Sequence, residues 1–166
     1  TNMSLTFSAG SSEIENFESN DIYEVSKKLS KGLLMGARGN SGVILSQIFR
    51  GISMGLEGQK ECNAVEFAHA LANGAKVAYK AVMKPKEGTI LTVAREIAIK
   101  ALEMSLETAD MNVFIESVLQ HGYETLNKTP DMLPVLKEAG VVDAGGQGLL
   151  CILEGAARVI IENLQI

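Results

Sequence analysis

The segment ILTVAREIAIKALEM, residues 90–104, decides the fold class. Its apolar residues recur at intervals of three and four, which places them on one face of an α-helix. They are Ile90, Val93, Ala94, Ile97, Ala98, Ala101 and Met104. Similar spacing recurs along the chain, and no segment alternates apolar and polar residues as a half-buried strand does. The sequence therefore predicts an all-α fold.

Periodicity and capping signals together predict eight helices. Asn63 and Glu66 form a capping-box pair. Thr129 precedes Pro130 as a cap precedes a first-turn proline, and Ser41 opens a strongly apolar run. The expected ranges are 2–16, 21–35, 41–57, 63–84, 89–109, 112–128, a short helix at 130–139, and 148–164. No internal repeat or linker interrupts them, so residues 1–166 are expected to form a single domain, an up-and-down antiparallel helical bundle or barrel.

Composition narrows the class of protein. The 166 residues are 46% apolar, which allows a substantial core, and 15 basic against 20 acidic residues give a net charge of −5. No basic stripe is present to neutralise nucleic-acid phosphates. Cys62 and Cys151 lie far apart without metal-ligand spacing, and the longest apolar runs are far below the ~18 residues of a membrane span. These features predict a cytoplasmic protein without a nucleic-acid partner or a membrane span.

Three connections between the predicted helices contain glycine beside polar residues. They are residues 36–42, 84–89 and 129–148. They alternate along the chain with shorter polar connections. In an up-and-down bundle every second connection lies at the same end, so the three loops and the chain start are expected to converge. The Gly51 and Gly55 pair, by contrast, predicts close packing between helices.

The chemistry of these loops favours phosphate. Backbone N–H groups at a helix start lack intrahelical acceptors, and the helix dipole attracts anions there. Asn40, Ser41 and Thr89 add short side chains that can donate to phosphate oxygens. A P-loop and a strand-borne GxGxxG are both absent, which argues against P-loop enzymes and Rossmann domains.

Three strings carry a family resemblance: GARGNSGVILSQIFRG at 36–51, EGTILTVARE at 87–96 and LPVLKEAGVVDAGGQGLL at 133–150. They resemble the kinase domain of the fatty acid kinase A subunit, which is related to the ATP-binding L subunit of dihydroxyacetone kinase. The likeness spans nearly the whole chain in the family order. It implies an eight-helix barrel that holds ATP and Mg²⁺ at one end. It also implies a phosphotransferase that acts on a fatty acid presented by a separate carrier subunit and gives an acyl phosphate.

The resemblance implies a set of nucleotide-site residues. Thr1 and Asn2 would border the metal–phosphate centre, Gly39, Asn40 and Ser41 would cradle phosphates, Gly88 and Thr89 would close on the nucleotide, and Asp143, Gly145 and Gly146 would border the ribose and adenine. For Asp143 an ordinary loop cap is an equally good interpretation. In the family an acidic DGDTG motif with the magnesium ligands, and a helix before it, precede the Thr-Asn-Met that opens this chain. The chain is therefore expected to be a truncated fragment that lacks that helix and the metal ligands and is inactive alone.

Two alternative functions stay open. A dihydroxyacetone kinase L subunit would share the scaffold, although such subunits typically carry a different serine-containing phosphate loop from GARGNSG. A non-catalytic helical interaction module would keep the scaffold without the metals. Arg38 fits either charge stabilisation on the transferring phosphoryl group or an ion pair with a carboxylate. No residue is assigned as catalytic, and His69 and His121 are interpreted as packed or solvated mid-helix residues.

Overall fold

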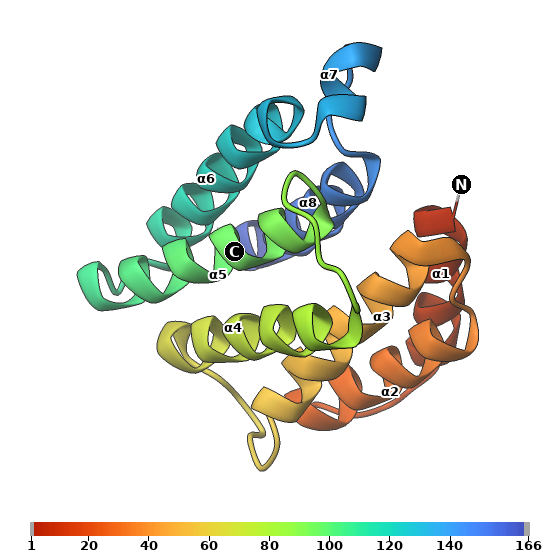
Figure 1. Ribbon diagram of the computed structural model, residues 1–166. Coiled ribbons are helices and arrows are strands. Elements are labelled where there is room, and N and C mark those ends of the chain that lie inside the picture. The colour runs from red at the N-terminus through yellow and green to blue at the C-terminus, as the bar shows by residue number, and fades with distance from the viewer. Residues whose placement is uncertain (1, 165–166) are drawn as a thin grey trace. The chain divides into compact units, whose positions relative to one another are not determined.

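The computed structural model describes residues 2–164, with side chains for residues 2–155 (Figure 1). This part of the chain contains eight helices and no strand, which confirms the all-α prediction. The helices are α1 (Asn2–Ile14), α2 (Ile22–Met35), α3 (Gly39–Gly55), α4 (Ala64–Ala81), α5 (Ile90–Glu107), α6 (Met111–Met132), α7 (Pro134–Ala139) and α8 (Ala144–Leu164). None of the helices in the described residues is long and apolar enough to cross a membrane.

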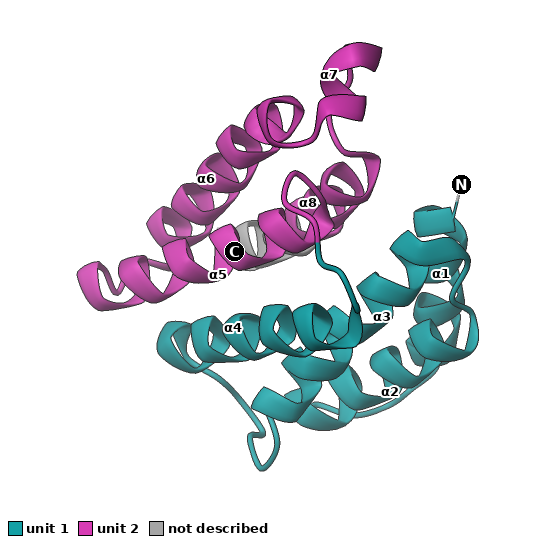
Figure 2. Cartoon of the chain, in the orientation of Figure 1, with its two compact units in different colours: residues 1–85 teal, residues 86–166 magenta. Residues whose placement is uncertain are grey.

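The chain divides into two compact units, Thr1–Pro85 and Lys86–Ile166 (Figure 2). In the first unit α3 packs against α2 and α4, and α1 lies against α2 and α3. In the second unit α5, α6 and α8 pack on one another, while the short α7 contacts α6. Each unit thus has a helical core of its own.

Helices α3 and α4 touch through their backbones. A Cβ atom added to Gly51 would lie 2.5 Å from the Cα of Gly74, and one added to Gly55 would lie 2.8 Å from the Cα of Ala70. These pairs run in opposite directions along the two helices, so α3 and α4 are antiparallel. The close packing predicted from the Gly51 and Gly55 spacing is confirmed.

Helix α6 contains Pro130, so the prediction that a helix begins there is wrong. A proline inside a helix has no N–H to donate to the carbonyl four residues earlier. Here the buried hydroxyl of Thr129 donates a 2.7 Å hydrogen bond to the Leu126 carbonyl, the group that Pro130 cannot reach. The helix therefore continues to Met132, and the next one begins with Pro134 in its first turn.

Two other helix starts differ from the expected ones. Helix α3 begins at Gly39 instead of Ser41, and α8 begins at Ala144 instead of residue 148. Both differences place predicted loop glycines inside the first helical turn. The Asn63 capping box is present as predicted, with its side chain and that of Glu66 each bonded to the other residue's backbone N–H.

Candidate functional site

Gly39 brings the starts of α1 and α3 together in the first unit. Its φ is +66°, a left-handed conformation that favours glycine. A Cβ atom at this position would lie 2.3 Å from the Asn2 Nδ2, so the Asn2 side chain rests directly on the glycine. Because Asn2 opens α1 and Gly39 opens α3, two helix N-termini lie next to each other.

The Thr6 side chain links the starts of α1 and α3 by hydrogen bonds. It is fully buried, and its hydroxyl donates to the Asn2 carbonyl at 2.7 Å and accepts from the Arg38 N–H at 2.9 Å. A Cβ atom on Gly42 would stand 2.3 Å from the same hydroxyl oxygen. Sequence reasoning missed Thr6, since nothing local distinguishes it from the other hydroxyl residues of α1.

The start of α3 is open to a ligand. Arg38 occupies the N-cap position but makes no capping hydrogen bond with its side chain. The backbone N–H groups of a first helical turn have no intrahelical acceptor, and those of α3 belong to exposed Gly39 and Asn40 and half-exposed Ser41. None of the ion pairs within the described residues involves Arg38, so the carboxylate pairing considered for it is not observed. This helix end can therefore accept an anion.

Asp143 joins the starts of α5 and α8 in the second unit. Its Oδ2 accepts a 2.8 Å hydrogen bond from the Gly146 N–H, and its carboxylate also accepts from the Ile90 backbone. Burial raises the pKa of Asp143 above its ordinary value, and these backbone hydrogen bonds counteract part of that rise. The carboxylate therefore caps backbone N–H groups, in keeping with the loop-cap interpretation, although the helix it precedes begins earlier than expected. Its predicted place near a nucleotide stays a prediction.

Two backbone N–H groups at the start of α5 already have hydrogen-bond acceptors within the protein. The Gly88 N–H donates to the Thr92 hydroxyl at 2.9 Å, and the Leu91 N–H donates to the Thr89 hydroxyl at 3.3 Å. The Thr89 hydroxyl in turn donates to the Lys86 carbonyl at 2.8 Å. In this conformation the α5 start has fewer free donors than the α3 start.

Gly88 and Gly146 of the second unit are tightly packed. Gly88 has a φ of +84°, and a Cβ atom there would lie 2.9 Å from both the Thr129 carbonyl oxygen and the Leu133 Cβ. Gly145 and Gly146 are buried, and a Cβ atom on Gly146 would lie 2.8 Å from the Val93 Cγ2. The loop before α5, the end of α6 and the start of α8 thus lie together.

The predicted site residues form two groups. The first unit brings Asn2 against Gly39, which leads directly into Asn40 and Ser41 at the start of α3. The second unit gathers the loop residues Gly88 and Thr89 and the α8 start with Asp143, Gly145 and Gly146. Thr1 lies outside the described residues. The meeting of the two groups at one end of the molecule stays a prediction.

The remaining candidates for chemistry are possible metal ligands and the two histidines. The described part of the chain holds no group of three or more His, Cys, Asp or Glu side chains that could bind a metal ion. His121 is half-buried with its Nε2 3.3 Å from the Glu96 Oε1, and His69 is exposed on α4. Both agree with the packed or solvated roles expected of them.

A family model described as the DAK2 domain matches residues 1–158. The chain belongs to the DAK2 domain family. This is the family of the dihydroxyacetone kinase L subunit; it is related to kinases and binds adenine nucleotides. The match covers all of the first compact unit and residues 86–158 of the second.

Relatives of this DAK2 domain occur in several bacteria. Protein YloV of Bacillus subtilis is 56% identical over 155 residues, which cover 93% of this chain and 28% of YloV. An uncharacterised protein of Staphylococcus epidermidis is 53% identical over 155 residues, or 93% of this chain and 28% of that protein. One of Staphylococcus aureus is 51% identical over 160 residues, or 96% and 29%. The DAK2 domain thus spans less than a third of the length of these relatives.

Proposed function

We propose that this DAK2 domain binds the ATP of a kinase that phosphorylates a fatty acid held by a separate carrier subunit. The observation that carries the proposal is the open start of α3 beside the start of α1. Arg38 leaves that helix end uncapped by its side chain, and Asn2 stands against Gly39 there. Adjacent helix N-termini concentrate positive potential where a polyphosphate would lie.

Each predicted residue has a role in this proposal. Gly39, Asn40 and Ser41 cradle the phosphates, with Thr1 and Asn2 at their edge. The second unit contributes Gly88 and Thr89 near the nucleotide, and Asp143, Gly145 and Gly146 near its ribose and base. The two units act as one domain, and the single family match across both supports this.

Magnesium is a separate requirement of phosphoryl transfer. Mg²⁺ prefers carboxylate, phosphate and water oxygens. The residues proposed to cradle the phosphates, Gly39, Asn40 and Ser41, include no carboxylate, so they do not fit the ion as side-chain ligands. Following the resemblance, we assign its ligands to an acidic motif that precedes Thr1 in the family.

The acceptor chemistry places few demands on the protein. A fatty acid carboxylate, like a glutamate side chain with a pKa of ~4.3, is ionised at neutral pH and needs no general base. One of its oxygens forms a bond to the γ-phosphorus, the bond from that phosphorus to the bridging oxygen breaks, and ADP leaves. The task of the DAK2 domain is to position the triphosphate for this in-line transfer.

Calorimetry with Mg-ATP tests nucleotide binding at the α3 start. The full-length protein is titrated as wild type, as Ser41→Ala and as Ser12→Ala. Ser12 is a matched control in the same unit, because its exposed hydroxyl donates only to the Ser8 carbonyl of its own helix. We expect Ser41→Ala to weaken binding about fivefold, the effect of one hydrogen bond, and Ser12→Ala to leave it unchanged. Absence of binding by the wild type would refute the proposal and favour a non-catalytic interaction module.

A coupled assay of ADP release distinguishes the acceptors. We expect turnover with a fatty acid supplied on its carrier subunit. Turnover with dihydroxyacetone and none with the fatty acid would assign the protein to the L-subunit branch instead.

A further inference from the structure

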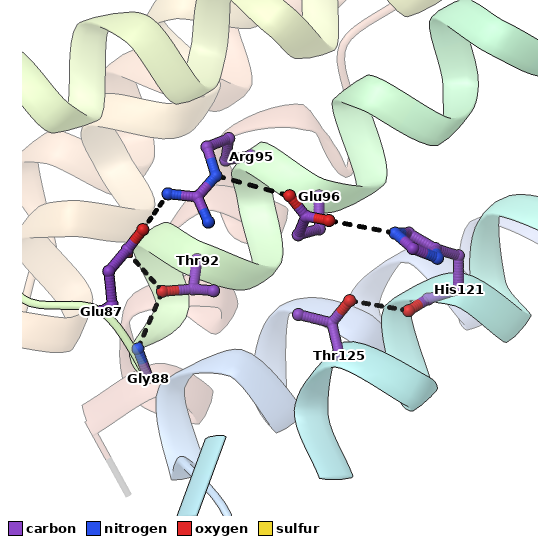
Figure 3. Close-up of polar contacts among 7 residues, drawn as sticks. All are labelled: Glu87, Gly88, Thr92, Arg95, Glu96, His121 and Thr125. Atoms are coloured by element: carbon purple, nitrogen blue, oxygen red, sulfur yellow. Dashed lines mark hydrogen bonds and ion pairs between the residues drawn. The ribbon is translucent and has the colours of Figure 1, made fainter. Parts of the chain in front are cut away.

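A single buried hydroxyl organises the loop that leads into α5 (Figure 3). Thr92 is fully buried, and its Oγ1 accepts the 2.9 Å hydrogen bond of the Gly88 N–H. The same hydroxyl donates to the Glu87 Oε2 at 2.7 Å. Thr92 therefore uses both its acceptor and its donor on the two residues that precede Thr89.

Arg95 extends this contact one turn further along α5. Its Nη1 contacts the other carboxylate oxygen of Glu87, and its Nε lies 3.5 Å from the Glu96 Oε2. The second oxygen of Glu96 faces His121 of α6 at 3.3 Å (Figure 3). A continuous line of polar contacts thus runs from the Gly88 N–H to α6.

These contacts determine geometry more than stability. The Arg95 and Glu87 side chains are 39% and 46% exposed, and ion pairs so accessible to solvent add little to the free energy of folding. Glu87, however, is held from two sides, by Thr92 and by Arg95. These two contacts restrict the rotamer of the carboxylate and so help to keep the Thr92 hydroxyl directed at Gly88.

We propose that Thr92, Glu87 and Arg95 are positioning residues for the nucleotide loop at the start of α5. Thr92 accepts the hydrogen bond of the Gly88 N–H and so fixes the left-handed backbone of Gly88. Arg95 acts indirectly, because it contacts the Glu87 carboxylate that binds Thr92. The loop then presents Thr89 in one conformation, which lowers the entropy cost of binding a nucleotide. This inference rests on the proposed function, because it names the residues that prepare part of the same site.

Amide hydrogen exchange of Gly88 tests the first step without any nucleotide. Thr92→Val removes the hydroxyl with little change of shape, and Thr92→Ser keeps it. The matched control is Thr125→Val, because Thr125 is also buried in the second unit but donates only to the His121 carbonyl of its own helix. We expect Gly88 exchange to rise about tenfold in Thr92→Val, and to stay near wild type in Thr92→Ser and Thr125→Val. Equal exchange in Thr92→Val and Thr125→Val would overturn the inference.

Mg-ATP affinity of the full-length protein tests the second step. We expect Thr92→Val to weaken binding about fivefold, while Thr92→Ser stays within about twofold of wild type. Arg95→Met should weaken binding in the wild-type background but have no further effect in Glu87→Gln, because Arg95 acts through the Glu87 carboxylate. An equal loss from Arg95→Met in both backgrounds would show that Arg95 does not act through the Glu87 carboxylate and would overturn its positioning role.

The two experiments separate this inference from the proposed function. If wild type fails to bind Mg-ATP, the proposed function and the nucleotide role of the loop fall together, whereas Gly88 exchange still reports whether Thr92 holds the loop. If wild type binds but Thr92→Val binds equally well, the nucleotide proposal stands and the positioning role is refuted.

Discussion

Gly88→Ala should destabilise the second unit far more than an alanine at another left-handed glycine. Gly88 has a φ of +84°, and any residue with a Cβ atom loses about 1–2 kcal/mol in the left-handed region. A Cβ atom at this position would also lie 2.9 Å from the Thr129 carbonyl oxygen and the Leu133 Cβ. Neither atom is the end of a flexible side chain, so the backbone must move, which costs about 1–3 kcal/mol more. The expected loss in the free energy of unfolding is therefore ~2–5 kcal/mol.

Two other glycines isolate the packing part of this loss. Gly140 lies in the same unit with a φ of +67°, and Gly58 has a φ of +82°. Among the described residues, only those adjoining each glycine in the chain lie within 4 Å of a Cβ atom added there. Alanine at these positions should cost only the backbone part, ~1–2 kcal/mol. Urea unfolding followed by far-UV circular dichroism measures all three variants. If Gly88→Ala comes within ~0.5 kcal/mol of both controls, the tight contact with α6 is not real.

Four further variants test other parts of the structure. Gly51→Ala should lower the free energy of unfolding by ~1–3 kcal/mol, because its Cβ atom would force α3 away from α4. At Gly155 an added Cβ meets no described atom within 4 Å apart from its own stretch of helix, so Gly155→Ala should raise the free energy of unfolding by up to ~1 kcal/mol. A urea titration in which Gly51→Ala is as stable as Gly155→Ala would contradict the packing of α3 against α4. Tyr123→Phe removes the 2.6 Å hydrogen bond to the Glu154 carboxylate and should cost ~1–2 kcal/mol in the same assay, and an unchanged midpoint would show that this contact contributes nothing. Burial raises the pKa of Asp143, so the folded state favours the protonated carboxyl group. The free energy of unfolding of the wild type, relative to that of Asp143→Asn, should be greatest in acid and fall as the pH rises through the raised pKa. If this free-energy difference instead grows with pH, attraction between the charged carboxylate and the backbone amides outweighs its desolvation.

Helical class and the main loops were predictable because their signals are local. The spacing of apolar residues in α5 shows its buried face whatever that face packs against, and the Gly51 and Gly55 pair needs only a neighbouring helix. The false helix start at Pro130 arose for the opposite reason. A proline can lie inside a helix when another group donates to the carbonyl that its missing N–H leaves free. Here the Thr129 hydroxyl donates that hydrogen bond to the Leu126 carbonyl.

The candidate site was predictable in its residues and less so in their roles. Glycines before a helix start indicate an anion site, but the sequence does not show which helix starts are already capped. Asp143 could be identified as a cap for the nearby Gly146, whereas its hydrogen bond from Ile90 joins residues far apart in the chain. The roles of Thr6 and Thr92 were missed because a hydroxyl reveals its partners only once the helices are packed.

The bond between Thr129 and Leu126 has a consequence for how this helix could have evolved. A lineage that gained Pro130 before Thr129 would have passed through a form with an unsatisfied buried carbonyl at Leu126, whereas the reverse order carries no such penalty. We therefore expect homologues that carry this proline to have a hydroxyl residue immediately before it.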